Sequence, residues 1–134
     1  TTGVSGLVAE ALSTGVLAYA PEEWRPLLLL AALYLSTSIL TEILSNTATI
    51  VLMAPIALQL AHQLNYAEHE ARAFLIATCI AASASFTTPI GYQTNTYVYS
   101  VGGYRFGGFM KVGLPLALLY FVGSLYIIPR VWSF

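Results

Sequence analysis

The chain has 134 residues, of which 57% are hydrophobic and only 8% are charged, and its net charge is −1. Soluble domains carry about 25% charged residues, so five basic and six acidic residues cannot cover a water-exposed surface. The composition excludes an ordinary soluble domain and indicates a membrane protein. The net charge gives no reason to expect a nucleic acid partner, and the single cysteine excludes an intramolecular disulfide.

Apolar stretches in chain order predict a polytopic helical protein. A moderately apolar stretch at residues 4–20 is followed by Pro21 and Pro26 around a charged turn. Further apolar stretches occupy residues 27–44, 48–61, 73–86 and 112–129, with polar loops at 62–72 and 102–108. The uncharged residues 43–61 and 112–129 are each expected to be of spanning length, since roughly 20 apolar residues cross a bilayer core. Because the chain begins without Met or a signal peptide, we expect it to be a fragment of a longer protein.

Three polar residues, Ser45, Asn46 and Thr47, interrupt the apolar residues 27–61. Irregular backbone at membrane depth occurs only where it is buried in protein or lines a wet cavity, and transporters use it near the midplane. Ser, Asn and Thr are good N-cap residues, so the triplet is expected to end one half-helix and begin another near Ala48. Free N–H groups there can hold an anion, and Thr41 can add an oxygen. The alternative is a kinked structural helix whose hydroxyls bond back to i−4 carbonyls.

A second uncharged polar stretch covers residues 87–96. Thr87 and Thr88 can cap a following helix with Pro89 at its first position, where a missing N–H is no loss. Gly91 permits a close approach of backbone or an unusual φ. Four side chains add donors and acceptors: Gln93, Thr94, Asn95 and Thr96. The alternative is a Pro-Gly kink whose polar groups are solvated at the membrane edge.

At these residues the sequence resembles the divalent anion:sodium symporters, within the wider ion-transporter superfamily. Residues 41–49, Thr-Glu-Ile-Leu-Ser-Asn-Thr-Ala-Thr, followed by Pro55, are similar to the second of that family's two Ser-Asn-Thr signatures. Thr88-Pro89 looks like the Thr-Pro of its broken helix, and residues 87–113 resemble the branch often described as sulfate or dicarboxylate permeases. The resemblance covers nearly the whole chain.

The resemblance implies an all-α membrane protein, a polytopic helix bundle in which residues 1–134 are the C-terminal repeat, one half of an inverted repeat. A re-entrant helical hairpin would occupy residues 27–62, a broken transmembrane helix residues 73–101 and a terminal transmembrane helix residues 112–129. The N-terminal half of the same protein would be the partner within a homodimer. The whole would be a multi-pass protein of the cell (inner or plasma) membrane, embedded in the lipid bilayer.

The resemblance also implies a site. The oxygens of a small anionic substrate, sulfate or a dicarboxylate, would be bound by Ser45, Asn46, Thr47 and Thr88. A sodium ion, the coupling ion and the only metal expected, would be bound by oxygens of Thr41, Leu44, Asn46 and Thr87. Further pocket candidates are Pro89, Gly91 and Asn95. Transport would be driven by the sodium gradient through alternating access, with no other cofactor.

Two departures from the family bear on these expectations. Only one of the two repeats is present, so the chain alone should not transport, and Ile90 stands where the family often has a second proline. Glu42 is an acid within an apolar stretch, and such residues are often functional. It could tune the sodium site or carry a proton, while the simpler interpretation is a carboxyl bonded within its own hairpin or facing water. His62 and His69 are expected to be solvated.

Several alternatives remain at this point. Within the superfamily they are a cation/proton antiporter and an oxyanion efflux permease. A non-transporting structural membrane subunit would tolerate alanine at both polar interruptions. An enzyme is not expected, because the sequence contains no Asp, no His-Glu-x-x-His and no Gly-x-Ser-x-Gly motif, and a nucleophilic serine needs a base within reach.

Overall fold

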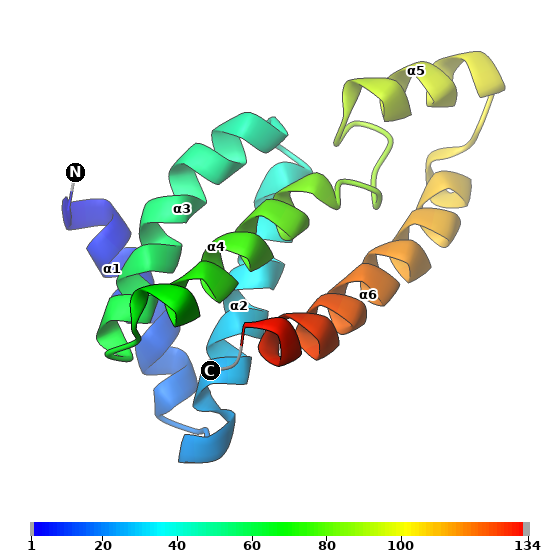
Figure 1. Cartoon of the computed structure of the whole chain (residues 1–134). Helices are drawn as coiled ribbons and strands as arrows, with labels where there is room; N and C mark the ends of the chain where they lie inside the picture. Colours follow the sequence, from blue (N-terminus) through cyan, green and yellow to red (C-terminus); the bar gives the residue numbers. More distant parts are fainter. Residues whose placement is uncertain (1, 133–134) are drawn as a thin grey trace.

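The computed structural model describes residues 2–132, and the regular secondary structure of these residues is helical (Figure 1). Within these residues there is no β-strand, which confirms the all-α prediction for the described part of the chain. The elements are α1 (Thr2–Leu17), the 3-10 helix η1 (Glu22–Trp24), α2 (Arg25–Thr41), α3 (Asn46–Gln63), α4 (Glu68–Ser83), α5 (Gln93–Gly102) and α6 (Phe106–Val131).

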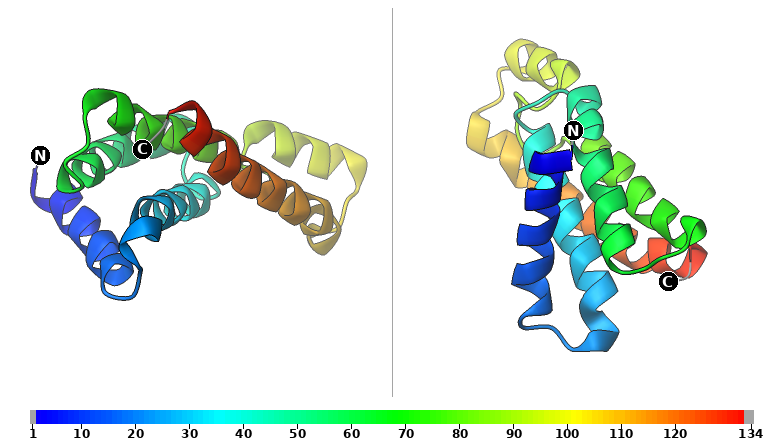
Figure 2. Two further views of the ribbon diagram at one scale, coloured as in Figure 1. Left: turned by 60° about the horizontal axis from the view of Figure 1, so that its bottom comes forward. Right: turned by 90° about the vertical axis from the view of Figure 1, so that its left-hand side faces the viewer.

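Helices α1 to α4 form the packed part of the molecule. Helix α4 lies against both α2 and α3, and α1 packs against α3 and α2 (Figures 1 and 2). The core includes large side chains of α2, such as Leu33 and Tyr34, of α3, such as Leu60, and small side chains together with Phe74 of α4. Ala77 and Ala81 are fully buried and Ser85 is nearly so. These residues lie at i, i+4 and i+8, and their small side chains let helix backbones approach closely.

Helix α6 crosses α2 and α4 with its C-terminal part, while its N-terminal part and α5 extend away from the bundle (Figure 2). We call α5 and α6 (residues 93–131) the arm. Ring contacts join α6 to the rest of the molecule and to α5: the Tyr34–Phe121 centroids lie 5.4 Å apart, those of Phe86–Tyr120 5.1 Å and those of Tyr99–Phe109 6.5 Å. The arm therefore packs against the bundle with one face and leaves most of its apolar side chains exposed.

The first residue of α6 differs from the prediction. Helix α6 begins at Phe106, so Gly107 lies in its first turn and not in the expected loop at residues 102–108. Glycine lowers helix stability by only about 1 kcal/mol, which a long apolar helix tolerates. The chain reverses instead at Gly103, whose φ of +62° favours a residue without Cβ.

Two helical segments of the described residues are long and apolar enough, by length and composition alone, to cross a bilayer: Glu22–Thr41 and Phe106–Val131. Helix α3 has 18 residues and is not among them, although the uncharged residues 43–61 approach spanning length. The reason is that part of that stretch forms the turn before α3, which leaves a shorter and more polar helix.

Candidate functional site

The first predicted interruption is a tight turn, called here the hairpin turn (residues 42–45), between the end of α2 and the start of α3. The Leu44 N–H donates to the Leu40 carbonyl at 2.8 Å, which closes the last turn of α2. Ser45 has an extended backbone and its Oγ accepts from the N–H of Ala48 at 3.2 Å. Ser45 is therefore the N-cap of α3, as predicted. The alternative of a kinked helix with back-bonded hydroxyls is wrong for Ser45.

The predicted triplet lies at the N-terminus of α3. Ser45 and Thr47 are exposed, and Asn46 is partly buried. The first N–H groups of a helix have no acceptor within it, so those of Asn46 and Thr47 are available to an anion. The positive end of the α3 dipole lies at the same place. Exposed hydroxyls, an amide and free N–H groups thus gather within one helical turn.

The structure brings two of the four predicted sodium ligands together. Thr41 is fully buried at the end of α2, and its hydroxyl is shared between the side-chain oxygen of Asn46 at 2.9 Å and the carbonyl of Ala82 at 2.6 Å. The hairpin turn is thereby tied to the last turn of α4. Leu44, another predicted ligand, lies in the turn itself.

The second interruption is a nonhelical segment, residues 84–92, between α4 and α5. We predicted that Thr87 and Thr88 cap a helix with Pro89 at its first position, and this is wrong. Helix α5 begins at Gln93, after an extended Tyr92, and Pro89 is buried in the loop. The physical reason is a tertiary contact: one carboxylate from another part of the chain binds both N–H groups and the Thr88 hydroxyl, and holds this stretch in a nonhelical conformation.

Those N–H groups are bound by Glu42 of the hairpin turn. Its Oε1 accepts from the Thr87 N–H at 2.9 Å, and its Oε2 accepts from the Thr88 N–H at 3.0 Å and from the Thr88 hydroxyl at 2.5 Å. The interpretation of a carboxyl bonded within its own hairpin is therefore wrong. Glu42 was not among the predicted site residues. The sequence does single it out, as an acid within an apolar stretch three residues before the polar triplet.

Side chains from α5 complete the 84–92 segment. The amide of Asn95 donates to the Ser85 carbonyl at 2.7 Å and to the Thr88 carbonyl at 3.3 Å, and the hydroxyl of Thr96 donates to the Pro89 carbonyl at 2.9 Å. Asn95 thus holds the ends of the segment together. Gln93 and Thr94, by contrast, are exposed.

Two glycines make room for the same segment. A Cβ on Gly91 would overlap the Ser85 hydroxyl and the carboxylate of Glu42, and a Cβ on Gly113 of α6 would overlap the carbonyl of Phe86. Both glycines are buried. Gly91 was predicted to permit a close approach, which the structure confirms. Gly113 was not among the predicted site residues, because nothing in its local sequence distinguishes it from other glycines of an apolar helix.

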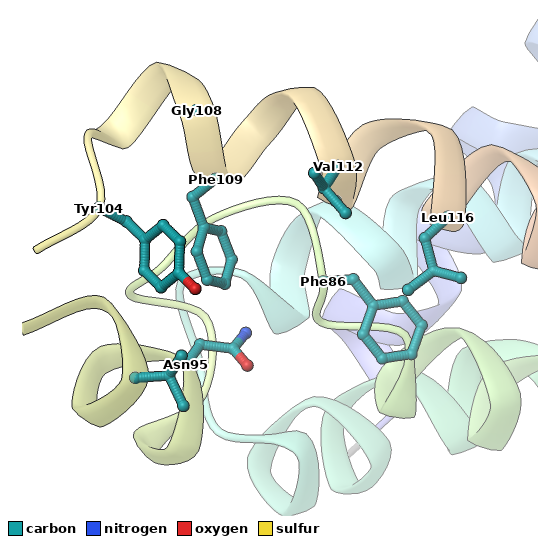
Figure 3. A pocket seen from close by; sticks show the side chains of 9 residues that line it. Phe86, Asn95, Tyr104, Gly108, Phe109, Val112 and Leu116 are labelled. Atoms are coloured by element: carbon teal, nitrogen blue, oxygen red, sulfur yellow. The ribbon is translucent and has the colours of Figure 1, made fainter. Parts of the chain in front are cut away.

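Two cavities of about 360 Å³ flank the segment. The first lies between the segment, α5 and α6 (Figure 3), and among its lining residues only Asn95 and Tyr104 carry polar side chains. Phe86 and Phe109 point into this space, which makes it unsuitable for an anion. The second lies between α2 and α6 and includes Glu42 and Thr87. Neither cavity includes Ser45, Asn46 or Thr47, which lie apart from both.

Comparison with known proteins identifies the family. The model of the citrate transporter family matches residues 1–78. An uncharacterized transporter of Synechocystis is 54% identical over 91 residues, which is 68% of this chain and 14% of the relative. The uncharacterized transporter YfbS of Escherichia coli is 35% identical over 83% of the chain and 18% of the relative. The probable sodium/sulfate cotransporter 3 of Chlamydomonas reinhardtii is 33% identical over 95% of the chain and 13% of the relative.

The chain therefore spans less than a fifth of the length of these relatives. No solved structure matches it significantly. The matched family and relatives are transporters and not enzymes, which confirms that an enzyme was not to be expected and indicates an integral membrane protein. Since the family model covers more than half of the chain, the chain belongs to the citrate transporter family, which confirms the predicted membership among the divalent anion:sodium symporters.

Proposed function

We propose that the complete protein containing this chain is a secondary transporter that moves a small divalent anion together with sodium, and that sulfate is the first substrate to test. The observation that carries the proposal is the hairpin turn, where Ser45, Asn46 and Thr47 begin α3 in a chain of a transporter family. Relatives described as sodium/sulfate cotransporters support sulfate and sodium. The family's description as citrate transporters makes di- and tricarboxylates the competing substrates.

The anion would be held without a formal positive charge. The side chains of Ser45, Asn46 and Thr47 and the first N–H groups of α3 supply hydrogen-bond donors at a helix N-terminus, which favours negative charge. Asp, Glu, Lys and Arg are all absent from residues 43–61, so the nearest acid is Glu42. Its charge is directed to Thr87 and Thr88, which leaves the start of α3 free for the substrate.

Sodium would be bound between the hairpin turn and the 84–92 segment, by oxygens of Thr41, Leu44, Asn46 and Thr87. Hydroxyl, amide and carbonyl oxygens are hard donors that suit a small hard cation. The short contact between Thr41 and Asn46 supports this set, and the Asn46 carbonyl oxygen keeps a second lone pair for a cation. Binding of anion and cation at adjacent turns would couple the two.

The architecture expected for such transport is part of the same proposal. Helices α2 and α3 would be a re-entrant hairpin, α4 and α5 the two parts of a broken transmembrane helix, and α6 the terminal transmembrane helix. An N-terminal half with inverted topology would complete the repeat. The protein would work as a homodimer in the inner or plasma membrane, by alternating access.

The test is uptake by proteoliposomes that contain the full-length protein. Labelled sulfate, succinate and citrate would be offered with and without an inward sodium gradient. We expect sodium-dependent sulfate uptake that is lost in Asn46→Ala. Gln63→Ala removes an exposed amide from the other end of the same helix and should leave uptake unchanged.

Other outcomes would replace the proposal. Uptake driven by a proton gradient in sodium-free buffer would contradict the sodium site. Sulfate loss from preloaded vesicles without uptake would favour an efflux permease. If no anion moves in either direction and Asn46→Ala matches the wild type, the hairpin turn is not a substrate site.

A further inference from the structure

A carboxylate joins the two interruptions of the fold. Glu42 belongs to the hairpin turn, and the hydrogen bonds of its carboxylate go to residues 45 and 46 positions later in the chain. Both carboxylate oxygens are used, and the donors are two consecutive backbone N–H groups and one hydroxyl. Consecutive N–H groups that point to one acceptor form a concave anion-binding arrangement, and here the anion is supplied by the protein itself.

The 84–92 segment depends on this contact. Within the segment, the Ala84 N–H donates to the Ala81 carbonyl of α4 and the Gly91 N–H to the Thr88 carbonyl. The N–H groups of Thr87 and Thr88 donate to the Glu42 carboxylate instead, and partly buried N–H groups need a partner. Glu42 provides that partner for Thr87 and Thr88. Without it, both N–H groups would be left unpaired or would seek other acceptors, and the segment would lose its conformation.

Neighbouring contacts show that the arrangement is built around Glu42. The hydroxyl of Thr41 donates to the Ala82 carbonyl at 2.6 Å, and the Ser85 hydroxyl donates to the Thr41 carbonyl at 3.4 Å. Residues 41 and 42 thus contact both ends of the stretch 82–88. Gly91 passes so close to Glu42 that any Cβ there would overlap the carboxylate. While Glu42 keeps this position, no residue larger than glycine fits at position 91.

We propose that Glu42 is a positioning residue: its carboxylate fixes the 84–92 segment against the hairpin turn, and the two interruptions form one unit. The inference rests on the proposed function in that this unit would hold the anion and sodium. It also assigns Thr88 a different partner from the one predicted. The hydroxyl and N–H of Thr88 bind Glu42, so the donors of the substrate site come from Ser45, Asn46 and Thr47.

The contact is tested by hydrogen–deuterium exchange of the full-length protein, read by mass spectrometry on peptides covering residues 84–92. Glu42→Gln keeps the size of the side chain but replaces one acceptor oxygen with a donor group. We expect exchange of the Thr87 and Thr88 amides to rise at least about tenfold, with peptides of α1 and α6 unchanged. Glu10→Gln, the same change on an exposed carboxyl of α1, should match the wild type.

A second variant keeps the test decisive if Glu42→Gln does not fold. Thr88→Val removes one of the three donors and should give a smaller, local rise, while Thr88→Ser retains the hydroxyl and should restore wild-type exchange. Thr94→Val changes an exposed threonine of α5 and serves as its control. Unchanged exchange at residues 84–92 in Glu42→Gln, or a rise spread over all helices, would overturn the proposal.

Measurements of transport distinguish a positioning role of Glu42 from a role in the stability of the fold alone. In proteoliposomes, Glu42→Gln should raise the half-saturation concentration for sulfate about tenfold, with thermal stability close to that of Glu10→Gln. A wild-type half-saturation concentration in a loosened Glu42→Gln protein would also overturn the proposal. Absence of uptake by the wild type would contradict the proposed function alone, because the exchange measurement reports on residues 84–92 without transport.

Discussion

The two interruptions of the helices are built in opposite ways. The hairpin turn is closed by neighbours in the sequence: Leu44 bonds to Leu40, and the Ser45 hydroxyl caps Ala48 three residues later. The 84–92 segment is closed mostly by distant residues, because Glu42 and Gly113 come from other parts of the chain. The conformation of the hairpin turn therefore depends mainly on its own residues, whereas that of the 84–92 segment depends on contacts from other parts of the chain.

The strongest way to break the 84–92 segment is Gly113→Ala. The added Cβ would overlap the backbone carbonyl of Phe86, and backbone cannot move aside as a side chain can. We expect a loss of about 1–3 kcal/mol in the free energy of unfolding, as for other overpacked sites, and loss of anion uptake. Gly123→Ala is the control, because nothing lies within 4 Å of that position on the same helix. It should be neutral or slightly stabilising in thermal unfolding.

Asn95→Asp tests the contact from α5. The change keeps the shape of the side chain but removes the two donors to the Ser85 and Thr88 carbonyls and places a carboxylate oxygen beside them. Each lost hydrogen bond contributes about 1 kcal/mol, so we expect a loss of roughly 2 kcal/mol and faster amide exchange at residues 84–92. Gln93→Glu, an exposed position of the same helix, should leave both unchanged. Equal effects of the two variants would contradict the role of Asn95.

Gly91→Ala should have an intermediate effect. Its Cβ would overlap the Glu42 carboxylate and the Ser85 hydroxyl, which are side-chain atoms that can shift. We expect a loss of about 1 kcal/mol in thermal unfolding. The Thr87 and Thr88 amides should exchange faster, because Glu42 must move away. Gly15→Ala, where no heavy atom lies within 4 Å, is the matched control. Protection of these amides equal to wild type would show that Gly91 is not needed for the contact.

An effect on stability no larger than that of Gly91→Ala is expected at the hairpin turn, where two substitutions separate folding from anion binding. Ser45→Ala removes the N-cap and should lower the free energy of unfolding by about 1 kcal/mol. Ser45→Asp keeps a capping oxygen and should preserve stability, but it adds a negative charge at the proposed anion site. Sulfate uptake should therefore fall more in Ser45→Asp than in Ser45→Ala. The reverse order would contradict anion binding at the start of α3.

The difference between local and distant contacts explains which features could be predicted from the sequence. The N-cap at Ser45 follows from residue types within one helical turn, whereas α2 ends at Thr41, three residues before the predicted end of the apolar stretch. The start of α5 was misplaced by four residues, because Thr87, Thr88 and Pro89 are a good local signal for a helix start. That signal is overridden by an acceptor 45 residues away. The role of Gly113 has no local signal, because most of the ten glycines have open space around them.

The sequence by itself determined that this is an apolar, helical chain with two polar interruptions and the Ser-Asn-Thr signature of a transporter family. Those features depend on composition, periodicity and capping, which act between near neighbours. Only the tertiary structure decided that Glu42 binds the backbone of Thr87 and Thr88, that Asn95 holds the ends of the same segment and that α6 approaches it at a glycine. A backbone without a helix must find hydrogen-bond partners wherever packing places them, and packing is a property of the whole chain.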